Sequence, residues 1–330
     1  MTLWGFSGIA GADDGFGDEN VHGESDGRNI GAGAGRGNGP LPGIVIEGGG
    51  GSGGSFSTTS TNWSPPACYY APEYTPEEFE QHYLDYLHSP LHSGKAEAVY
   101  WYRENYGEEG GVNFNLDAEE EGMWWGSFIN TASDDHEGKL ACSEPWFWVP
   151  FGEAPPPLPG VPTPELLAGL AYEHTRVPDT EIALNPEDAD HQIVNLPTWI
   201  WTEGSSTAPV SVTARVVGYD IWATTTAEPD RLTIDPGTRD AVTHPASGEC
   251  GIAGDGTIGE PYRAGRAEEP PPCGVTYLRA THSGGPHQLL ATLTWDVSWV
   301  GSGGAGGDLP DGSVSTPQDI EVEEIQAVVR

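Results

Sequence analysis

Thirteen consecutive residues near the C-terminus, Gln288 to Val300, contain no glycine or proline and are rich in β-branched and aromatic side chains. Apolar and polar side chains alternate along this stretch with a period of two, so the apolar ones fall on one face of a strand. That face consists of Leu289, Ala291, Leu293, Trp295, Val297 and Trp299. The pattern predicts a long central strand in an antiparallel sheet, with a second sheet packed against the apolar face.

The C-terminal half contains further short strand-like segments separated by turn residues. Many short strands with turns between them are typical of a β-sandwich of the immunoglobulin type. We therefore expect a mainly β protein with an Ig-like antiparallel sandwich over residues 181–330. The segments are 182–184, 193–194, 198–202, 210–217, 219–226, 231–234, 275–279, the long stretch above, and 319–329.

An aromatic-rich segment, residues 65–149, precedes the sandwich and predicts a small α+β domain. Its clearest signal is Thr75-Pro-Glu-Glu78, where a capping hydroxyl, a first-turn proline and a glutamate at the third helical position predict a helix start. The helix should end near His88, before Pro90. Four later segments have a strand-like composition, and they are 98–102, 112–116, 123–129 and 146–149.

Three remaining segments have compositions that argue against an independent core. Residues 1–12 are uncharged and mostly apolar and end in Ala-Gly-Ala, as expected for the tail of a secretory signal peptide whose start lies upstream. Residues 13–64 are rich in glycine and serine and predict a disordered tether. Residues 150–180 predict a proline-rich hinge with a short helix that begins at Thr163.

The charge limits the classes of partner, and the cysteine content favours an exported protein. The chain has 50 acidic and 13 basic residues, and such a surface repels nucleic acid and anionic lipid. No segment approaches the roughly twenty apolar residues of a membrane span. The four cysteines are even in number and lack zinc-site spacing, which predicts two disulfides. Three pairings are possible, and the simplest joins Cys68 to Cys142 and Cys250 to Cys273, within each predicted domain.

The order of several motifs resembles a group of secreted actinobacterial proteins, mainly from streptomycetes, that have no assigned activity. The resemblance implies export and a C-terminal β-sandwich of the polycystic-kidney-disease (PKD) type. The segment 273–277 matches the strand start of that sandwich, whereas 234–239 keeps Asp235 and Gly237 of its turn and lacks the tryptophan. The motifs are Pro66-Ala-Cys-Tyr-Tyr70, Tyr74-Thr-Pro-Glu-Glu78, Gly122-Met-Trp-Trp-Gly126, Trp146-Phe-Trp-Val-Pro150, Val194-Asn-Leu-Pro-Thr-Trp-Ile-Trp201 and Thr292-Leu-Thr-Trp-Asp-Val-Ser-Trp299.

Paired tryptophans are the first candidates for a ligand site, because flat rings can stack on sugars. The pairs 146/148, 199/201 and 295/299 each fall on one face of a strand, and this favours a place in the core. The adjacent residues Trp124 and Trp125 must point to opposite faces. One of these two is therefore the best candidate for an exposed contact with a ligand or partner.

Metal and catalytic motifs are weak. His88 and His92 have a zinc-compatible spacing, but Pro90 separates them and no third ligand is evident. The acidic clusters 119–121 and 134–136 lack the alternating oxygen ligands of a calcium loop. No Gly-x-Ser-x-Gly motif is present. The sequence thus predicts no metal, no cofactor and no catalytic residue.

These observations lead to a hypothesis of a secreted or cell-envelope-exposed protein that is not an enzyme and binds a protein partner. Two alternatives stay open. The first is a module that binds cell-wall or other glycans through exposed tryptophans, and the second is an extracellular hydrolase. A row of exposed aromatic side chains would favour the first alternative, and buried carboxylates clustered in a cleft would favour the second.

Overall fold

The computed structural model describes residues 41–49, 54–55, 57–58, 66–88, 96–130, 133–187, 191–202, 207–267, 269–281 and 285–325. The expected signal-peptide tail, residues 1–12, and much of the expected tether lie outside this part of the chain. The described protein is mainly β, its sheets are antiparallel except for one short parallel pair, and helices are few. The expected fold class is therefore confirmed at this level.

The largest sheet is built around strand β16 (His287–Gly301), which pairs with one neighbour on each side along almost its whole length. Fifteen residues of strand span about 50 Å. All six apolar residues predicted for one face are buried. The order is β1 (Ile44–Gly48), β11 (Val210–Val216), β12 (Trp222–Asp235), β16, β17 (Gly306–Ile320) and β3 (Ser57–Thr58), and β14 (Glu249–Gly251) also pairs with β12.

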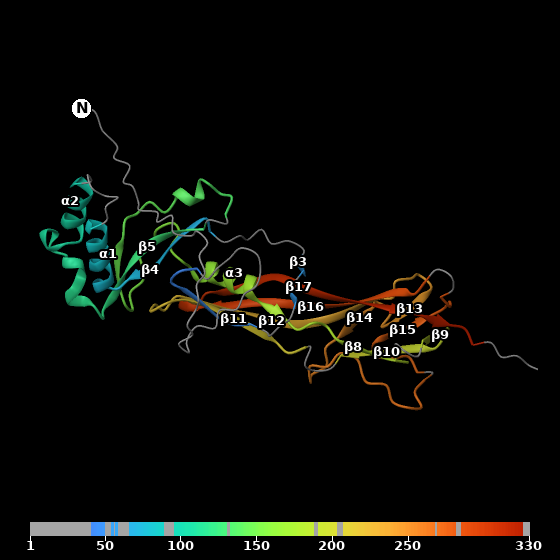
Figure 1. Cartoon of the computed structure of the whole chain (residues 1–330). Helices are drawn as coiled ribbons and strands as arrows, with labels where there is room; N and C mark the ends of the chain where they lie inside the picture. The colour runs from blue at the N-terminus through green and yellow to red at the C-terminus, as the bar shows by residue number, and fades with distance from the viewer. Residues whose placement is uncertain are drawn as a thin grey trace, which may run out of the picture.

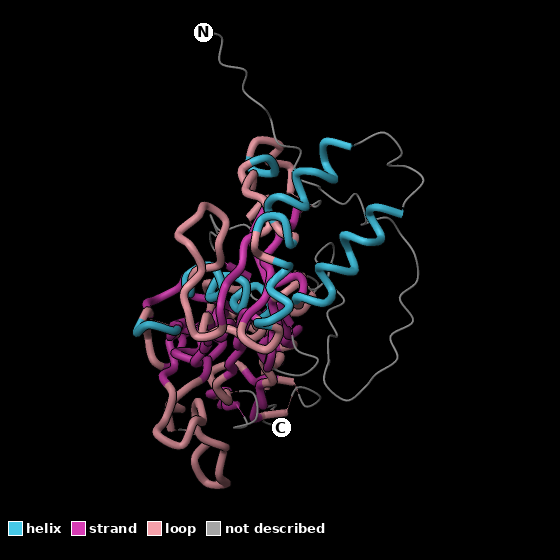
Figure 2. Tube along the Cα trace, turned by 90° about the vertical axis from the view of Figure 1, so that its left-hand side faces the viewer, coloured by secondary structure: helices cyan, strands magenta, loops and turns pink. Residues whose placement is uncertain are grey.

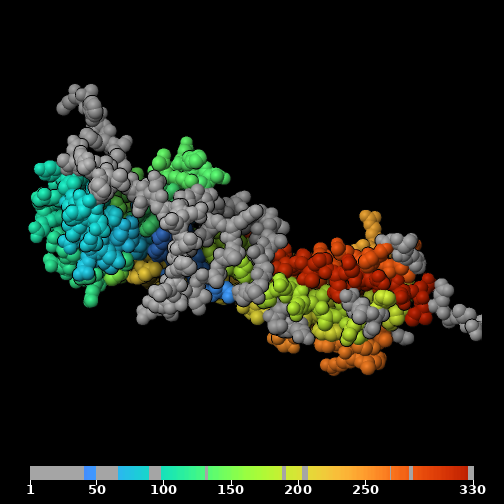
Figure 3. All heavy atoms as spheres, in the orientation of Figure 1, coloured from blue at the N-terminus to red at the C-terminus, as the bar shows by residue number. Residues whose placement is uncertain are grey.

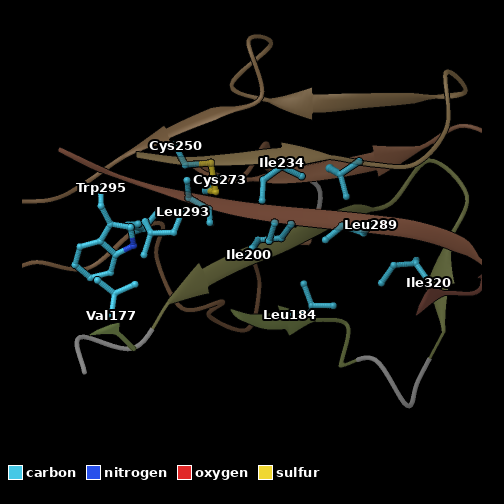
Figure 4. Close-up of a cluster of buried hydrophobic side chains, with 14 of the residues drawn as sticks. Val177, Leu184, Ile200, Ile234, Cys250, Cys273, Leu289, Leu293, Trp295 and Ile320 are labelled. Carbon is cyan, nitrogen blue, oxygen red and sulfur yellow. A yellow bond between two sulfur atoms is a disulfide. The ribbon is translucent and has the colours of Figure 1, made fainter. Parts of the chain in front are cut away.

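A second sheet packs face to face on one half of this apolar face, as predicted. Ile200 and Leu184 of the second sheet lie in one core cluster with Leu289 and Leu293 of β16, and Figure 4 shows these side chains between the two layers. We call this half the distal sandwich. The order of the second sheet is β13 (Ala241–His244), β15 (Gly274–Tyr277), β10 (Pro197–Thr202) and β8 (Ile182–Asn185).

Helix α3 (Pro164–His174) covers the other half of the same face. Its Thr163 cap accepts a hydrogen bond from the Leu166 backbone N–H, which confirms the predicted helix start. Leu167 and Leu170 are buried against β11 and β12, and the Thr225 hydroxyl of β12 donates to the Ala168 carbonyl. The segment expected as a free hinge is therefore part of the core, because its helix is apolar enough to be buried on the sheet.

A three-stranded sheet, β4 (Cys68–Tyr74), β5 (Gly122–Ile129) and β6 (Phe147–Pro150), shares this second core with α3 and the large sheet. Tyr219, in the turn between β11 and β12, ties the two sheets together. Its hydroxyl donates to the Val149 carbonyl at 2.6 Å and accepts from the Met123 backbone N–H at 3.1 Å. The two predicted domains thus share one core along a single sheet.

One end of the elongated molecule is helical, and the distal sandwich forms the other end (Figure 1). We refer to the described residues of α1, α2, η2 and η3 as the helical end. The prediction of strands at 98–102 and 112–116 is wrong. The first segment lies in α2, and the second forms the start of a 3-10 helix in which Phe114 has a left-handed backbone conformation. The elements are α1 (Pro76–His88), α2 (Ala96–Asn105), η2 (Glu108–Gly110) and η3 (Asn113–Ala118).

Two strands of the large sheet depart from the sequence-based expectations. Strand β1 lies in the segment expected as a disordered tether, and its five residues pair with β11. Of strand β17 only the last two residues fall in an expected strand, 319–329, because the strand contains two prolines and three glycines. It nevertheless pairs with β16 along its length, and with β3 at only two residues. Proline is tolerated in edge strands, where its missing N–H faces away from the neighbour. The shorter pairs are β2 (Gly54–Ser55) with β7 (Arg176–Val177) and β9 (Gln192–Ile193) with β18 (Val322–Glu323).

All four cysteines form the two disulfides expected from the simplest pairing. Cys68 of β4 is bonded to Cys142, in the segment that precedes β6. Cys250 of β14 is bonded to Cys273, the residue before β15, so this bond joins the two sheets of the distal sandwich. Such bonds are typical of proteins that fold in an oxidising environment.

We expect the distal sandwich to lose stability as the pH falls below about 6.5, the ordinary histidine value. Burial lowers the pKa of His244 in β13 below the value it has in the unfolded chain. The unfolded chain therefore binds the proton first, and folding is penalised below that pH. Thermal unfolding between pH 5 and 8 should show a steeper acid-side decline of Tm for the wild type than for His244→Gln. Parallel profiles would contradict this assignment.

Candidate functional site

Trp124 and Trp125 in β5 point to opposite faces of the three-stranded sheet, as the sequence predicted. The expectation that one of them is exposed is wrong, since Trp124 is 4% exposed and Trp125 is fully buried. Trp125 contacts Tyr219 in the core shared with the large sheet. Trp124 packs against Phe79 of α1 and donates its indole N–H to the Phe114 carbonyl. The face of the three-stranded sheet that carries Trp124 is therefore covered by the helical end.

A half-buried carboxylate lies at the margin of this covered face. Glu73 is the extra residue of a bulge in β4, between Pro72 and Tyr74 in the pairing with β5. Its Oε2 atom accepts a hydrogen bond of 2.6 Å from the indole N–H of Trp146. The contact passes over Gly126 of β5, where a Cβ atom would lie 1.7 Å from that oxygen. The absence of a side chain at residue 126 therefore makes the contact possible.

Half-buried rings surround this carboxylate. The Tyr74 hydroxyl and His82 Nδ1 are hydrogen-bonded at 3.2 Å, and the His82 and Trp146 rings lie 5.7 Å apart. The Tyr106 hydroxyl donates to the Trp146 carbonyl at 3.1 Å. Burial raises the pKa values of Tyr102 and Tyr106, so both hydroxyls stay protonated. The contact of Tyr102 with Trp146 fixes the position of α2 against the three-stranded sheet.

The outer surface of α2 carries two adjacent exposed aromatic residues. Tyr100 is 63% exposed and Trp101 is 41% exposed, whereas Tyr102 beside them is buried. Trp101 contacts Tyr102 and Tyr106 edge to face at 5.7 and 5.5 Å between ring centroids, which holds its ring in place. Sequence analysis missed this pair, because residues 98–102 were expected to form a strand. Figure 3 shows the helical end as one end of the elongated body, and Figure 2 views it end-on.

Of the three tryptophan pairs expected in the core, the pair 295/299 is confirmed, whereas Trp146, Trp148 and Trp201 are only half-buried. Trp295 is fully buried and Trp299 is 8% exposed, both on the apolar face of β16. Trp199 is also fully buried, but it lies outside the shared cores. It is covered by the Arg266 guanidinium, 4.6 Å from its ring centroid, and by the Tyr262 ring at 5.8 Å. Arg266 is held by ion pairs to Glu260 and Glu269.

Among the described residues, no group of three or more histidine, cysteine, aspartate or glutamate side chains could hold a metal ion. His88 hydrogen-bonds to its own helix through the Leu84 carbonyl, and His92 lies outside the described residues. Glu119 to Glu121 are exposed, and Asp135 accepts a hydrogen bond from the Gly138 backbone N–H. None of the helices that the structure describes is long and apolar enough to cross a membrane.

Comparisons of the chain with protein families, with curated proteins and with solved structures found no match. Among the described side chains, the strongest candidate for recognition is the exposed pair Tyr100 and Trp101, of which Trp101 packs against the buried rings of Tyr102 and Tyr106. Glu73, Trp146 and His82 form a second, half-buried candidate at the margin of the same sheet.

We expect Gly126→Ala to lower the free energy of unfolding by about 1–3 kcal/mol, the range for a lost hydrogen bond to a charged group. The new methyl group would displace the Glu73 carboxylate from Trp146. Urea unfolding measures the change, and the same substitution in a Trp146→Phe background is the control. A loss of equal size in that background would show that the hydrogen bond is not the cause.

Proposed function

We propose that this chain is a secreted or cell-surface protein that is not an enzyme and that binds a protein partner through its helical end. The observation that carries the proposal is the exposure of two successive aromatic residues of α2, Tyr100 and Trp101. Tyrosine and tryptophan are enriched among the residues that contribute most to protein interfaces. Exposed rings held in place by buried neighbours also lose little conformational entropy when they bind.

The rest of the molecule acts as a rigid support for that end. Both cores lie on one face of the large sheet, and a disulfide is anchored in each of them. The helical end is attached through Phe79 of α1, which packs on Trp124, and through Tyr102 of α2, which contacts Trp146. The disulfides support a location outside the cell. The resemblance to secreted actinobacterial proteins, with a PKD or Ig-like sandwich in the C-terminal half, supports the same proposal.

A glycan-binding function is the alternative, and a specific observation favours keeping it. Trp146 and Trp148 are only partly buried, and Trp146 lies beside the Glu73 carboxylate and His82. Aromatic faces next to hydrogen-bond acceptors suit a sugar ring. Trp124 and Trp125, the tryptophans first expected to serve, cannot reach a glycan because they are buried.

A pull-down from envelope and culture-supernatant fractions tests the proposal, with parallel binding to protein-stripped cell wall. The bait is the full chain, compared with Tyr100→Ala and with the control Leu278→Ala, an exposed apolar residue that follows β15 in the distal sandwich. We expect a stoichiometric protein partner that Leu278→Ala retains, and a loss of about tenfold or more in Tyr100→Ala, as for an interface hot spot. Retention on stripped wall that soluble glycan competes away would overturn the proposal in favour of the alternative.

A further inference from the structure

We propose that the partner presents a basic segment, rich in arginine and lysine, to the aromatic pair of α2. This inference rests on the proposed function and specifies the chemistry of the partner. It commits to a polypeptide segment, because the features described below suit a flexible chain with several cationic side chains.

The helical end concentrates the acidic charge of the protein. Residues 73–121 include thirteen acidic and two basic residues, an excess per residue well above that of the whole chain, which has 50 acidic and 13 basic residues in 330. Of the two basic residues, Arg103 is paired with Glu109, and Lys95 lies outside the described residues. The field at this end therefore attracts cations and repels anionic polymers.

The aromatic pair supplies faces for those cations. Tyr100 is the more exposed ring, and Glu104 lies one helical turn further on, on the same side of α2. Glu104 is in the last turn of the helix, where the dipole also favours positive charge. Arginine or lysine side chains bind aromatic faces, and a nearby carboxylate strengthens the contact.

Element η2 places a further carboxylate next to the last turn of α2. Element η2, with the exposed Glu108, follows α2 directly and packs on its last turn, where a Cβ atom at Gly110 would lie 2.0 Å from the Glu104 carbonyl oxygen. Carboxylates thus lie around one end of the aromatic pair. A neutral sugar would gain nothing from this excess of charge, whereas a basic segment would.

Binding of two defined peptides to the full chain, followed by calorimetry, tests the inference. The first is a twelve-residue peptide of alternating arginine and glycine, and the second is the same peptide with citrulline in place of arginine. The variants are Tyr100→Ala, the pair Glu104→Gln with Glu108→Gln, and the distant pair Asp319→Asn with Glu324→Gln, which are exposed at the distal sandwich. The distant pair removes the same charge from the other part of the molecule.

We expect the arginine peptide alone to bind, with affinity reduced about three- to fivefold by Tyr100→Ala, as for an exposed cation–π contact. The Glu104/Glu108 pair should reduce affinity about three- to tenfold, as for two exposed ion pairs, and the distant pair should change it less than twofold. Equal losses from the two charge pairs would overturn the inference, since they would indicate attraction to the net charge alone. Failure of the arginine peptide to compete with a captured partner would also overturn it while leaving the proposed function intact.

Discussion

Replacement of Cys68 and Cys142 together by alanine is expected to lower the free energy of unfolding by about 4 kcal/mol. This disulfide closes a loop with a sequence separation of 74, so its loss greatly increases the conformational freedom of the unfolded chain. Both cysteines are buried in the core that α3, the three-stranded sheet and the large sheet share. Guanidinium unfolding of the oxidised protein and the double variant measures the difference.

The second disulfide provides the matched comparison. Cys250 and Cys273 are separated by 23 residues, so their replacement should cost about 3 kcal/mol in the same chain-entropy treatment. Because the two cores lie on one sheet, each variant should still unfold in a single transition. A smaller loss for the 68/142 pair than for the 250/273 pair, or two separate transitions, would contradict the account of a shared core.

Trp295→Ala is expected to destabilise the protein by about 3–5 kcal/mol, as for a large side chain removed from a packed core. Trp295 is fully buried on β16, and Figure 4 shows it beside Val177 at one end of the distal core. The pairing on both sides of β16 shifts register near this residue, between Pro229 and Arg231 and between Trp295 and Val297. Because the neighbouring strands have irregular backbones here, they cannot easily close over the cavity that the alanine substitution would leave.

The substitution Trp295→Phe distinguishes the effect of lost side-chain volume from the effect of the buried indole N–H. In the described part of the chain, the indole N–H of Trp295 has no hydrogen-bond partner. Its removal relieves a buried polar group, which offsets part of the lost volume, so we expect a change within about 1.5 kcal/mol. The surface control is Trp222→Phe, where the indole N–H donates to the Asp220 carboxylate. A cost for Trp295→Phe as large as for Trp295→Ala would contradict this assignment.

The features predicted correctly were those with a strong local signal. Strand β16 alternates apolar and polar residues without interruption, so its central place and buried face could be inferred from periodicity. The capping box at Thr75 and Glu78 forms reciprocally, with bonds of 2.8 and 3.3 Å. The disulfide pairing followed from the domain order, although the sequence alone left three pairings open.

The errors arose where tertiary contacts override composition. Residues 98–102 are rich in β-forming types, yet they form a helix, because Tyr102 packs between α1 and the sheet. Strand β17 has the glycine and proline content of a loop, and it pairs with β16 along its length and with β3 at only two residues. The opposite directions of Trp124 and Trp125 follow from strand geometry. The cover over Trp124 comes from α1 and η3, whose packing on the sheet has no local signal in the sequence.

The candidate site was only partly accessible from sequence for the same reason. The acidic excess was evident, but the place of Tyr100 and Trp101 on the outside of a helix was not. The contact between Glu73 and Trp146 joins residues 73 positions apart and depends on a bulge and on Gly126. Such contacts require knowledge of the sheet register, which periodicity alone does not supply.

Hydrogen–deuterium exchange of the captured complex, compared with the free chain, tests the central claim most directly. If the helical end is the recognition surface, binding should slow exchange in peptides that cover α2 and η2, residues 96–110, and leave β17, residues 306–320, unchanged. Slower exchange confined to β17, with no change in α2, would contradict the account and place the partner on the large sheet.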